Sequence, residues 1–178
     1  MNFLVCLKQT FDTEEKIVLK NGEISEDAVE FIINPYDEYA VEEAIRLKEI
    51  HGGEITVLTV GPGRTEQALR SALAMGADKA IIVDTEDFEG ELDEYSISEL
   101  IYAVLEEQDD SYDLILCGYM AVDDGSAQVG PRLAQLLKIP HVSTIIKITI
   151  DEKAVLLEKD VEGDIEHIQT SLPLLVTT

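Results

Sequence analysis

Short apolar runs rich in β-branched residues alternate along this chain with longer segments whose apolar residues recur at helical spacing. Each run is too short and too β-branched to favour a helix, so we expect buried strands at residues 3–7, 55–60, 80–83 and 114–117. The segments between them predict amphipathic helices at residues 36–51, 65–75, 96–107 and 126–137. Strands and helices that alternate with short connections are typical of an α/β fold, in which helices cover both faces of an open parallel sheet and make a three-layer sandwich.

Two segments break this alternation. Residues 17–33 contain an Asn-Gly turn signal at 21–22 and predict a hairpin or excursion after the first strand. Residues 141–178 contain no convincing helix, and their alternating pattern suggests antiparallel strands at the sheet edge over 147–150, 155–157 and 165–170. In the same segment, a period of two suggests that one solvated strand face carries Asp160, Glu162, Asp164 and Glu166.

The charge of the chain restricts its partners. With 13 basic and 37 acidic side chains among 178 residues, the formal net charge is −24. Proteins that bind nucleic acid or anionic membranes use clustered Lys and Arg, so we expect this chain to bind no nucleic acid and no membrane surface. No apolar run approaches the ~18 residues of a membrane span, so we expect no membrane insertion and, by default, a cytoplasmic location. The length predicts one domain, or one domain with an appendage, and we expect a single domain over residues 1–178.

The residues that follow each predicted strand are candidates for a binding site, because open α/β sheets bind ligands beyond the carboxyl ends of their strands. The longest such element spans residues 118–131. Gly125 would let the backbone approach a ligand, and the amides of residues 127–129 would open a helix whose positive end attracts phosphate. The loop also fits a simple helix start capped by Asp124 or Ser126, and the residues alone leave both interpretations open.

Other chemistries find little support in the sequence. The Gly-Pro-Gly turn at 61–63 imitates only the start of a dinucleotide-binding fingerprint, because Glu66 replaces the third glycine. The sequence has no hydrolase elbow, zinc-protease or P-loop motif, and its three histidines fall in unrelated segments. Cys6 and Cys117 lie inside apolar runs without a CxxC pair, so we interpret them as small core residues.

Six ordered motifs resemble the beta subunit of electron transfer flavoproteins, from the first strand to the last residue. The two most specific are Asn-Pro-Tyr-Asp-Glu at 34–38 and Ala-Met-Gly-Ala-Asp at 74–78. The others are the first strand with Lys8-Gln9, the Val-Gly-Pro turn at 60–62, the loop at 121–131, and a closing pattern that begins at Lys159 and ends with Leu-Pro at 172–173 and Val-Thr at 176–177.

The resemblance implies a Rossmann-like fold of the adenine nucleotide alpha hydrolase type, with a site for AMP or FAD. It also implies a heterodimer with an FAD-carrying alpha subunit, which supports electron transfer between flavin dehydrogenases and downstream acceptors. Such a subunit is an electron carrier without acid–base residues of its own, because the flavin does the redox chemistry. The electron-bifurcating members of the family also engage NADH.

Carried over by motif, the nucleotide contacts would come from the ends of three strands, the Asn-Pro-Tyr-Asp motif and the long loop. These residues are Cys6, Asn34, Pro35, Tyr36, Asp37, Val60, Gly61, Gly118, Met120, Ala121, Asp123, Asp124, Gly125, Ser126, Ala127, Gln128 and Val129. Residues 126–129 would face phosphate. Asp123 or Asp124 would meet ribose hydroxyls, because a carboxylate beside phosphate is repelled.

The sequence departs from the family pattern at two places. Tyr-Met at 119–120 stands where many members have Lys-Gln, and Asp-Gly-Ser at 124–126 stands where bifurcating members commonly have Gly-Asp-Thr. AMP and FAD therefore both stay open. The chain also stops at Thr178, so we expect a nucleotide-binding domain without the C-terminal docking arm of the family.

Two alternatives to an electron-transfer subunit stay open. One is a stand-alone sensor of adenine nucleotides on the same fold, which would act through ligand-dependent association. The other is an enzyme that hydrolyses or transfers an adenylyl group, with magnesium on Asp123 and Asp124. The second is disfavoured because no lysine lies near these carboxylates in the sequence.

Overall fold

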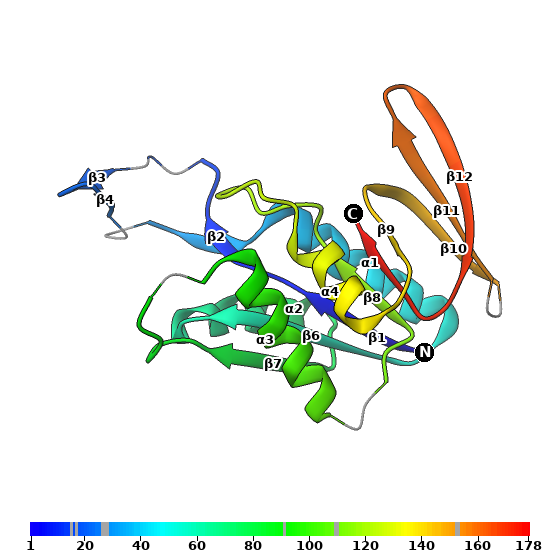
Figure 1. The fold of residues 1–178 in the computed structure, drawn as a ribbon, viewed down its shortest axis with the longest axis horizontal. Helices are drawn as coiled ribbons and strands as arrows, with labels where there is room; N and C mark the ends of the chain where they lie inside the picture. Colours follow the sequence, from blue (N-terminus) through cyan, green and yellow to red (C-terminus); the bar gives the residue numbers. More distant parts are fainter. Residues whose placement is uncertain (15, 17, 26–28, 91, 109–110, 152–153) are drawn as a thin grey trace.

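The structure, a computed structural model, describes residues 1–14, 16, 18–25, 29–90, 92–108, 111–151 and 154–178. Its largest sheet has six strands, all parallel, in the order β7-β6-β1-β8-β13-β9 (Figure 1). The strands are β1 (Asn2–Cys6), β6 (Glu54–Gly61), β7 (Lys79–Asp84), β8 (Leu114–Cys117), β9 (His141–Val142) and β13 (Leu174–Thr177). Each of the four predicted strands coincides with or overlaps one of these, so the predicted parallel sheet is confirmed.

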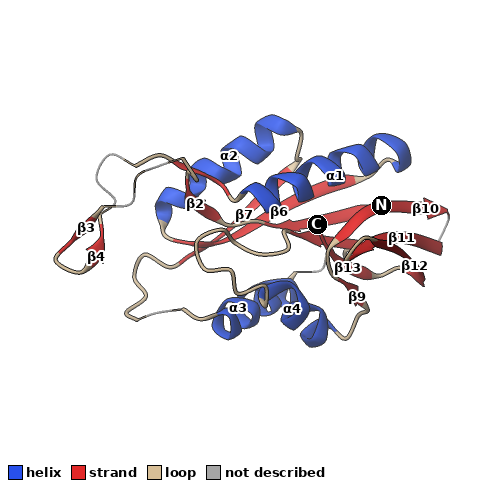
Figure 2. Ribbon diagram, turned by 90° about the horizontal axis from the view of Figure 1, so that it is seen from above, coloured by secondary structure: helices blue, strands red, loops and turns tan. Residues whose placement is uncertain are grey.

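Helices cover both faces of this sheet. α1 (Pro35–His51) and α2 (Glu66–Met75) lie on one side, and α3 (Glu94–Glu107) and α4 (Val129–Leu137) lie on the other (Figure 2). A short 3-10 turn, η1 (Gly63–Thr65), leads into α2. The predicted three-layer α/β arrangement is therefore confirmed. None of the helices in the described part of the chain has the length and apolar character that crossing a bilayer demands.

Side chains of β1 alternate between the two helical layers, as the period of a strand requires. Phe3 and Val5 pack into the core beneath α1 and α2, whereas Leu4 and Cys6 pack into the core beneath α3 and α4. Both cysteines are free and buried, and Cys117 lies in the same core as Cys6. Their interpretation as small core residues is confirmed.

Local sequence signals explain both ends of α1. Pro35 occupies its first turn, where a missing N–H breaks no helical hydrogen bond. Asp37 and Glu38 follow in the same turn, where the positive end of the helix dipole favours carboxylates. Gly52 ends the helix with a φ of 69°, a conformation that glycine adopts at little cost.

Two local predictions are wrong. Residues 80–83 do form a strand, β7, but it lies at the edge of the sheet, where its side chains are exposed or half-buried. The fourth helix begins at Val129 and not at Ser126. Ala127 adopts a left-handed conformation (φ 54°), which a right-handed helix excludes.

The C-terminal segment divides between two sheets. The predicted antiparallel strands are confirmed as β10 (Ile145–Asp151), β11 (Ala154–Val161) and β12 (Asp164–Ser171), but they form a three-stranded sheet of their own. A turn at 162–163 separates β11 from β12, so Asp160 faces away from Asp164 and Glu166. The single acidic strand face predicted from the period of two is therefore wrong.

β13 returns to the six-stranded sheet and lies between β8 and β9, parallel to both. Leu174, Leu175 and Val176 are fully buried there. The sequence predictions had not assigned this strand. Residues 174–177 therefore form an internal strand of the six-stranded sheet.

The predicted excursion after the first strand is present. β2 (Gln9–Phe11) pairs with β5 (Phe31–Ile33), and between them β3 (Leu19–Lys20) pairs with β4 (Glu23–Ile24). Asn21 and Gly22 connect β3 to β4 with positive φ values of 55° and 89°, as expected for a tight hairpin. Ile17, where the predicted excursion begins, lies outside the described residues.

The full burial of Leu174 on β13 predicts a large effect for Leu174→Ala. This change should lower the free energy of unfolding by about 2–5 kcal/mol, because it leaves a cavity in the buried core. Ile165→Ala is the matched control, since its side chain is 54% exposed on β12, and it should cost at most about 0.5 kcal/mol. Urea unfolding followed by circular dichroism measures both, and equal losses would contradict the placement of β13.

Candidate functional site

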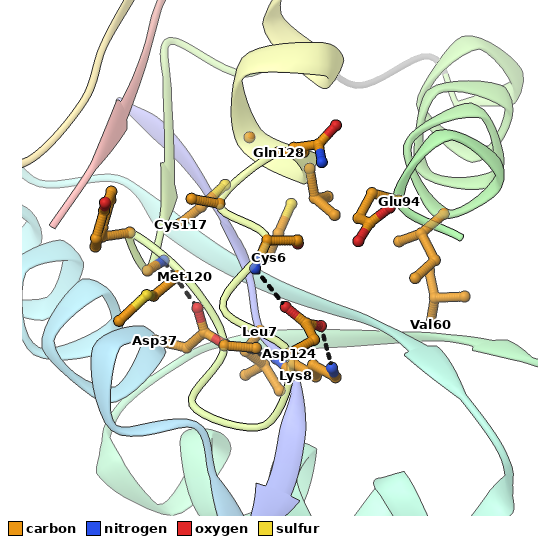
Figure 3. Close-up of a pocket in the computed structure, with 18 of the residues that line it drawn as sticks. Cys6, Leu7, Lys8, Asp37, Val60, Glu94, Cys117, Met120, Asp124 and Gln128 are labelled. Carbon is orange, nitrogen blue, oxygen red and sulfur yellow. Dashed lines mark hydrogen bonds and ion pairs between the residues drawn. The ribbon is translucent and has the colours of Figure 1, made fainter. Parts of the chain in front are cut away.

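A pocket lies where β1, β6 and β8 end, at the carboxyl edge of the parallel sheet. The chain passes from β1 to β6 and β7 on one side and then returns to β8 on the other side of β1. The strand order therefore reverses at the β1–β8 pair, which is where open α/β sheets bind ligands. Leu58 and Val60 of β6 and Ile97 and Ile101 of α3 form an apolar wall, and the loop between β8 and α4 supplies further lining (Figure 3).

The buried carboxylate of Asp37, in the first turn of α1, joins the ends of β1 and β8. Its Oδ2 accepts the Lys8 N–H at 2.7 Å, and its Oδ1 accepts the Gly118 N–H at 2.8 Å. Glycine is required at 118, because a Cβ there would collide with Asp37 Oδ1 and lie 2.8 Å from the Asp37 nitrogen. This contact fixes where the loop leaves the sheet.

Burial changes the acidity of Asp37. Its removal from water raises the pKa of Asp37 to about 6, although the N–H groups of Lys8 and Gly118 and the side chain of Asn34 act in the opposite direction. The group is therefore mostly ionised at neutral pH and titrates only slightly below it.

Asn34, just before α1, holds the loop that follows β8. Its Nδ2 donates to the Met120 carbonyl at 2.9 Å, and its Oδ1 accepts the Val122 N–H at 3.1 Å. The side chain is only 1% exposed, so both of these bonds are protected from water. The Asn-Pro-Tyr-Asp motif thus shapes the pocket through two buried side chains, Asn34 and Asp37.

Lys8 ties the far part of the same loop to the end of β1. Its Nζ lies 2.8 Å from Asp123 Oδ1 and 2.7 Å from Asp124 Oδ2. The other oxygen of Asp124 accepts the Ser126 N–H at 2.8 Å (Figure 3). Burial lowers the pKa of Lys8, but the two carboxylates outweigh it and raise this pKa. Burial also raises the pKa of Asp124, but Lys8 and the Ser126 N–H keep this pKa below its ordinary value.

Backbone donors gather where the loop meets α4. Gly125 (φ 66°) and Ala127 (φ 54°) both adopt the left-handed conformation, and residues 126–130 line the pocket. Within the described ranges, the N–H groups of Ala127 and Gln128 have no protein acceptor. The first N–H groups of a helix such as α4 lack helical partners as well. Unpaired donors at a helix start attract an anion.

The structure pairs Lys8 with Asp123 and Asp124, the two carboxylates to which the enzyme alternative assigns magnesium. Lys8 already supplies the positive charge between these carboxylates, although it is 115 residues from Asp123 in the sequence. Among the residues that the structure describes, no group of three or more His, Cys, Asp or Glu side chains could hold a metal ion.

The sequence matches known proteins over nearly its whole length. The model of the electron transfer flavoprotein domain matches residues 22–178. The chain belongs to the electron transfer flavoprotein domain family. It is 56% identical over 177 residues to the electron transfer flavoprotein subunit beta of Bacillus subtilis, with 99% of this chain and 68% of the relative covered.

Two more distant relatives likewise match nearly all of this chain and about two thirds of their own length. The electron transfer flavoprotein subunit beta of Syntrophomonas wolfei is 40% identical over 179 residues, which cover 100% of this chain and 69% of the relative. Protein FixA of Azotobacter vinelandii is 39% identical over 184 residues, which cover 99% of this chain and 65% of the relative. The resemblance seen in the six motifs is confirmed.

The structure brings most of the residues predicted to contact a nucleotide into one pocket of this electron transfer flavoprotein domain. Those in its lining are Cys6, Asp37, Val60, Gly118, Met120, Ala121, Asp124, Ser126, Ala127, Gln128 and Val129. Outside the lining lie Asn34, Pro35, Tyr36, Gly61, Asp123 and Gly125. Of these, Asn34 and Asp123 act indirectly, since their side chains hold lining residues in place.

Several lining residues were absent from the predicted set. Lys8, Glu94, Ile97 and Ile101 are the clearest of these. Lys8 directly follows the first predicted strand, so the rule that ligands bind at carboxyl ends made it a candidate, but the contacts carried over by motif left it out. The position of α3 over the pocket is a long-range property that no local signal reveals.

The close contact at Gly118 predicts that Gly118→Ala destabilises the protein by about 1–3 kcal/mol. The added Cβ would clash with backbone atoms, which cannot move aside as a flexible side chain can. Gly63→Ala is the matched control, since the nearest atom to its new Cβ would be Glu86 Oε2 at 3.9 Å. Urea unfolding measures the stability of both variants. A Gly118→Ala protein with the same free energy of unfolding as the wild type would refute the arrangement around Asp37.

The raised pKa of Asp37 predicts a pH-dependent contribution to stability. An unfolded Asp releases its proton near pH 3.8, whereas native Asp37 keeps its proton up to about pH 6. The native state thus binds more protons in this window, and the free energy of unfolding falls as pH rises through it. Compared with Asp37→Asn, whose amide does not titrate, the wild type should lose about 2 kcal/mol between about pH 4 and pH 6.5.

Urea unfolding across this pH range measures that difference, and carbon NMR of the Asp37 carboxyl measures its pKa directly. A difference that does not change with pH, together with an NMR midpoint near the unfolded value, would show that Asp37 is well solvated.

Proposed function

We propose that this chain is the beta subunit of an electron transfer flavoprotein and that its pocket binds AMP or FAD. The observation that carries the proposal is the pocket at the β1–β8 end, where an apolar wall lies beside unpaired backbone N–H groups. An adenine ring fits an apolar wall and a phosphate group fits such donors, so the lining suits both ends of an adenine nucleotide. The 56% identity to a protein named electron transfer flavoprotein subunit beta supports the same function.

Different lining residues would bind the base, the phosphate and the ribose of the nucleotide. Val60 and Ile101 would contact the base, and the N–H groups of residues 127–129, which follow the bonded Ser126 N–H, would bind phosphate. Asp124 keeps acceptor capacity for a ribose hydroxyl, because each carboxylate oxygen can accept more than one hydrogen bond. When a flavin is bound in such a pocket, it supplies the redox chemistry, and the residues of this chain bind and orient it.

The proposed subunit forms a heterodimer with an FAD-carrying alpha subunit and passes electrons between flavin dehydrogenases and downstream acceptors. The names of the relatives support assembly over a stand-alone sensor. Besides the two beta subunits, they include the acryloyl-CoA reductase electron transfer subunit gamma of Anaerotignum propionicum, 35% identical over 179 residues. Residues 1–178 would form the nucleotide-binding domain of this subunit. The cytoplasmic location stays a prediction of the sequence.

Calorimetric titration with AMP and with FAD tests the proposal, on protein co-expressed with the alpha subunit of the same organism. We expect at least one ligand to bind with a stoichiometry of one per beta chain. Mass spectrometry of the ligand released from freshly purified protein then distinguishes AMP from FAD. A preparation with the alpha subunit present that binds neither ligand would rule the proposal out.

A charged variant in the apolar wall locates the binding site. Val60→Asp places a carboxylate against the expected position of the base and should weaken binding at least about tenfold. Val161→Asp is the matched control on β11, since its side chain is 43% exposed outside the pocket, and it should leave the affinity unchanged. Equal affinities in the two variants would place the nucleotide elsewhere.

A further inference from the structure

The charges around the pocket oppose an anionic ligand. Among the described residues that line it, Lys8 is the only Lys or Arg, whereas the carboxylates are those of Asp37, Glu94 and Asp124. The whole chain carries a formal net charge of −24 as well. Backbone donors at a helix start act within about one helical turn, so they do not cancel this wider field. A phosphate group therefore depends on the one cation in the lining.

Lys8 is placed to offset the charge closest to those backbone donors. Its Nζ contacts Asp123 and Asp124 at 2.8 and 2.7 Å, and the Asp124 carboxylate itself bonds the Ser126 N–H. The three side chains are 39%, 31% and 41% exposed, and ion pairs this exposed add little to folding stability. Their larger effect is local: the formal charge of the cluster is −1 with Lys8 and −2 without it.

We propose that Lys8 is a positioning residue that makes the pocket selective for phosphorylated adenosine over adenosine itself. By neutralising part of the Asp123–Asp124 charge, it lets a phosphate group approach the N–H groups that follow Ser126. Without Lys8, the two carboxylates repel phosphate, whereas uncharged adenosine escapes this repulsion. The inference rests on the nucleotide-binding function proposed above and specifies which form of the ligand that site prefers.

Calorimetry with AMP and with adenosine tests the inference, on the same preparation used for the functional test and at low ionic strength. In Lys8→Met the ratio of AMP affinity to adenosine affinity should fall on the order of five- to tenfold, as expected for losing one charge at this range. Lys8→Arg keeps the charge and should restore most of the ratio. Lys147→Met is the matched control: its lysine pairs with Glu158 at 2.7 Å outside the pocket, and its loss changes the net charge equally.

Neutral variants of the carboxylates provide a second measurement that does not depend on the folding of Lys8→Met. Asp124→Asn keeps a side-chain oxygen for the Ser126 N–H but removes one repelling charge, so it should raise the ratio in the wild-type background. Adding Asp123→Asn and Asp124→Asn to Lys8→Met should restore the ratio.

The outcomes separate the inference from the proposed function. If Lys8→Met loses affinity for AMP and adenosine by the same factor, Lys8 only shapes the loop and the inference is overturned, while nucleotide binding stands. An unchanged ratio in Asp124→Asn would overturn it likewise. If the wild type binds neither AMP nor adenosine nor FAD, the proposed function itself fails.

Discussion

The buried carboxylate of Asp37 sets the position of the pocket relative to the sheet. It accepts N–H groups from Lys8 at the end of β1 and from Gly118 at the end of β8, so three segments distant in sequence meet at one group. An unpaired buried donor costs about 1–3 kcal/mol, which explains why a charge persists where burial disfavours it. The glycine at 118 and the raised pKa of Asp37 both follow from this contact.

The rest of the pocket is built outward from that contact. Asn34, three residues before Asp37, fixes the first part of the loop through the backbone of Met120 and Val122. Lys8, whose N–H is bound by Asp37, fixes the later part through its own side chain. Among the described residues of this loop, the N–H groups of Ala127 and Gln128, which follow the bonded Ser126 N–H, have no protein acceptor. A strongly acidic chain can thus offer an anion site without a basic patch.

Local sequence patterns were sufficient to predict the parallel sheet and its helical layers, because the periods of strands and helices are visible in neighbouring residues. They also placed the candidate site at the carboxyl ends of the strands, where the structure has a pocket. Contacts between distant residues were not predictable. β13 is four residues long, and only its pairing with β8 and β9 makes it an internal strand of the sheet. The later start of α4 depends on the left-handed conformation of Ala127, which its residue type does not signal. Lys8 meets Asp123 across 115 residues, so no sequence window contains both.

A crystal structure of the protein with AMP, in complex with its partner subunit, tests most directly whether this pocket is an adenine nucleotide site organised by Asp37. The account predicts the base against Val60 and Ile101, the phosphate on the N–H groups of residues 127–129, and the Asp37 carboxylate still bonded to the N–H groups of Lys8 and Gly118. A nucleotide bound away from the β1–β8 end, or an Asp37 carboxylate released from both strands, would contradict it.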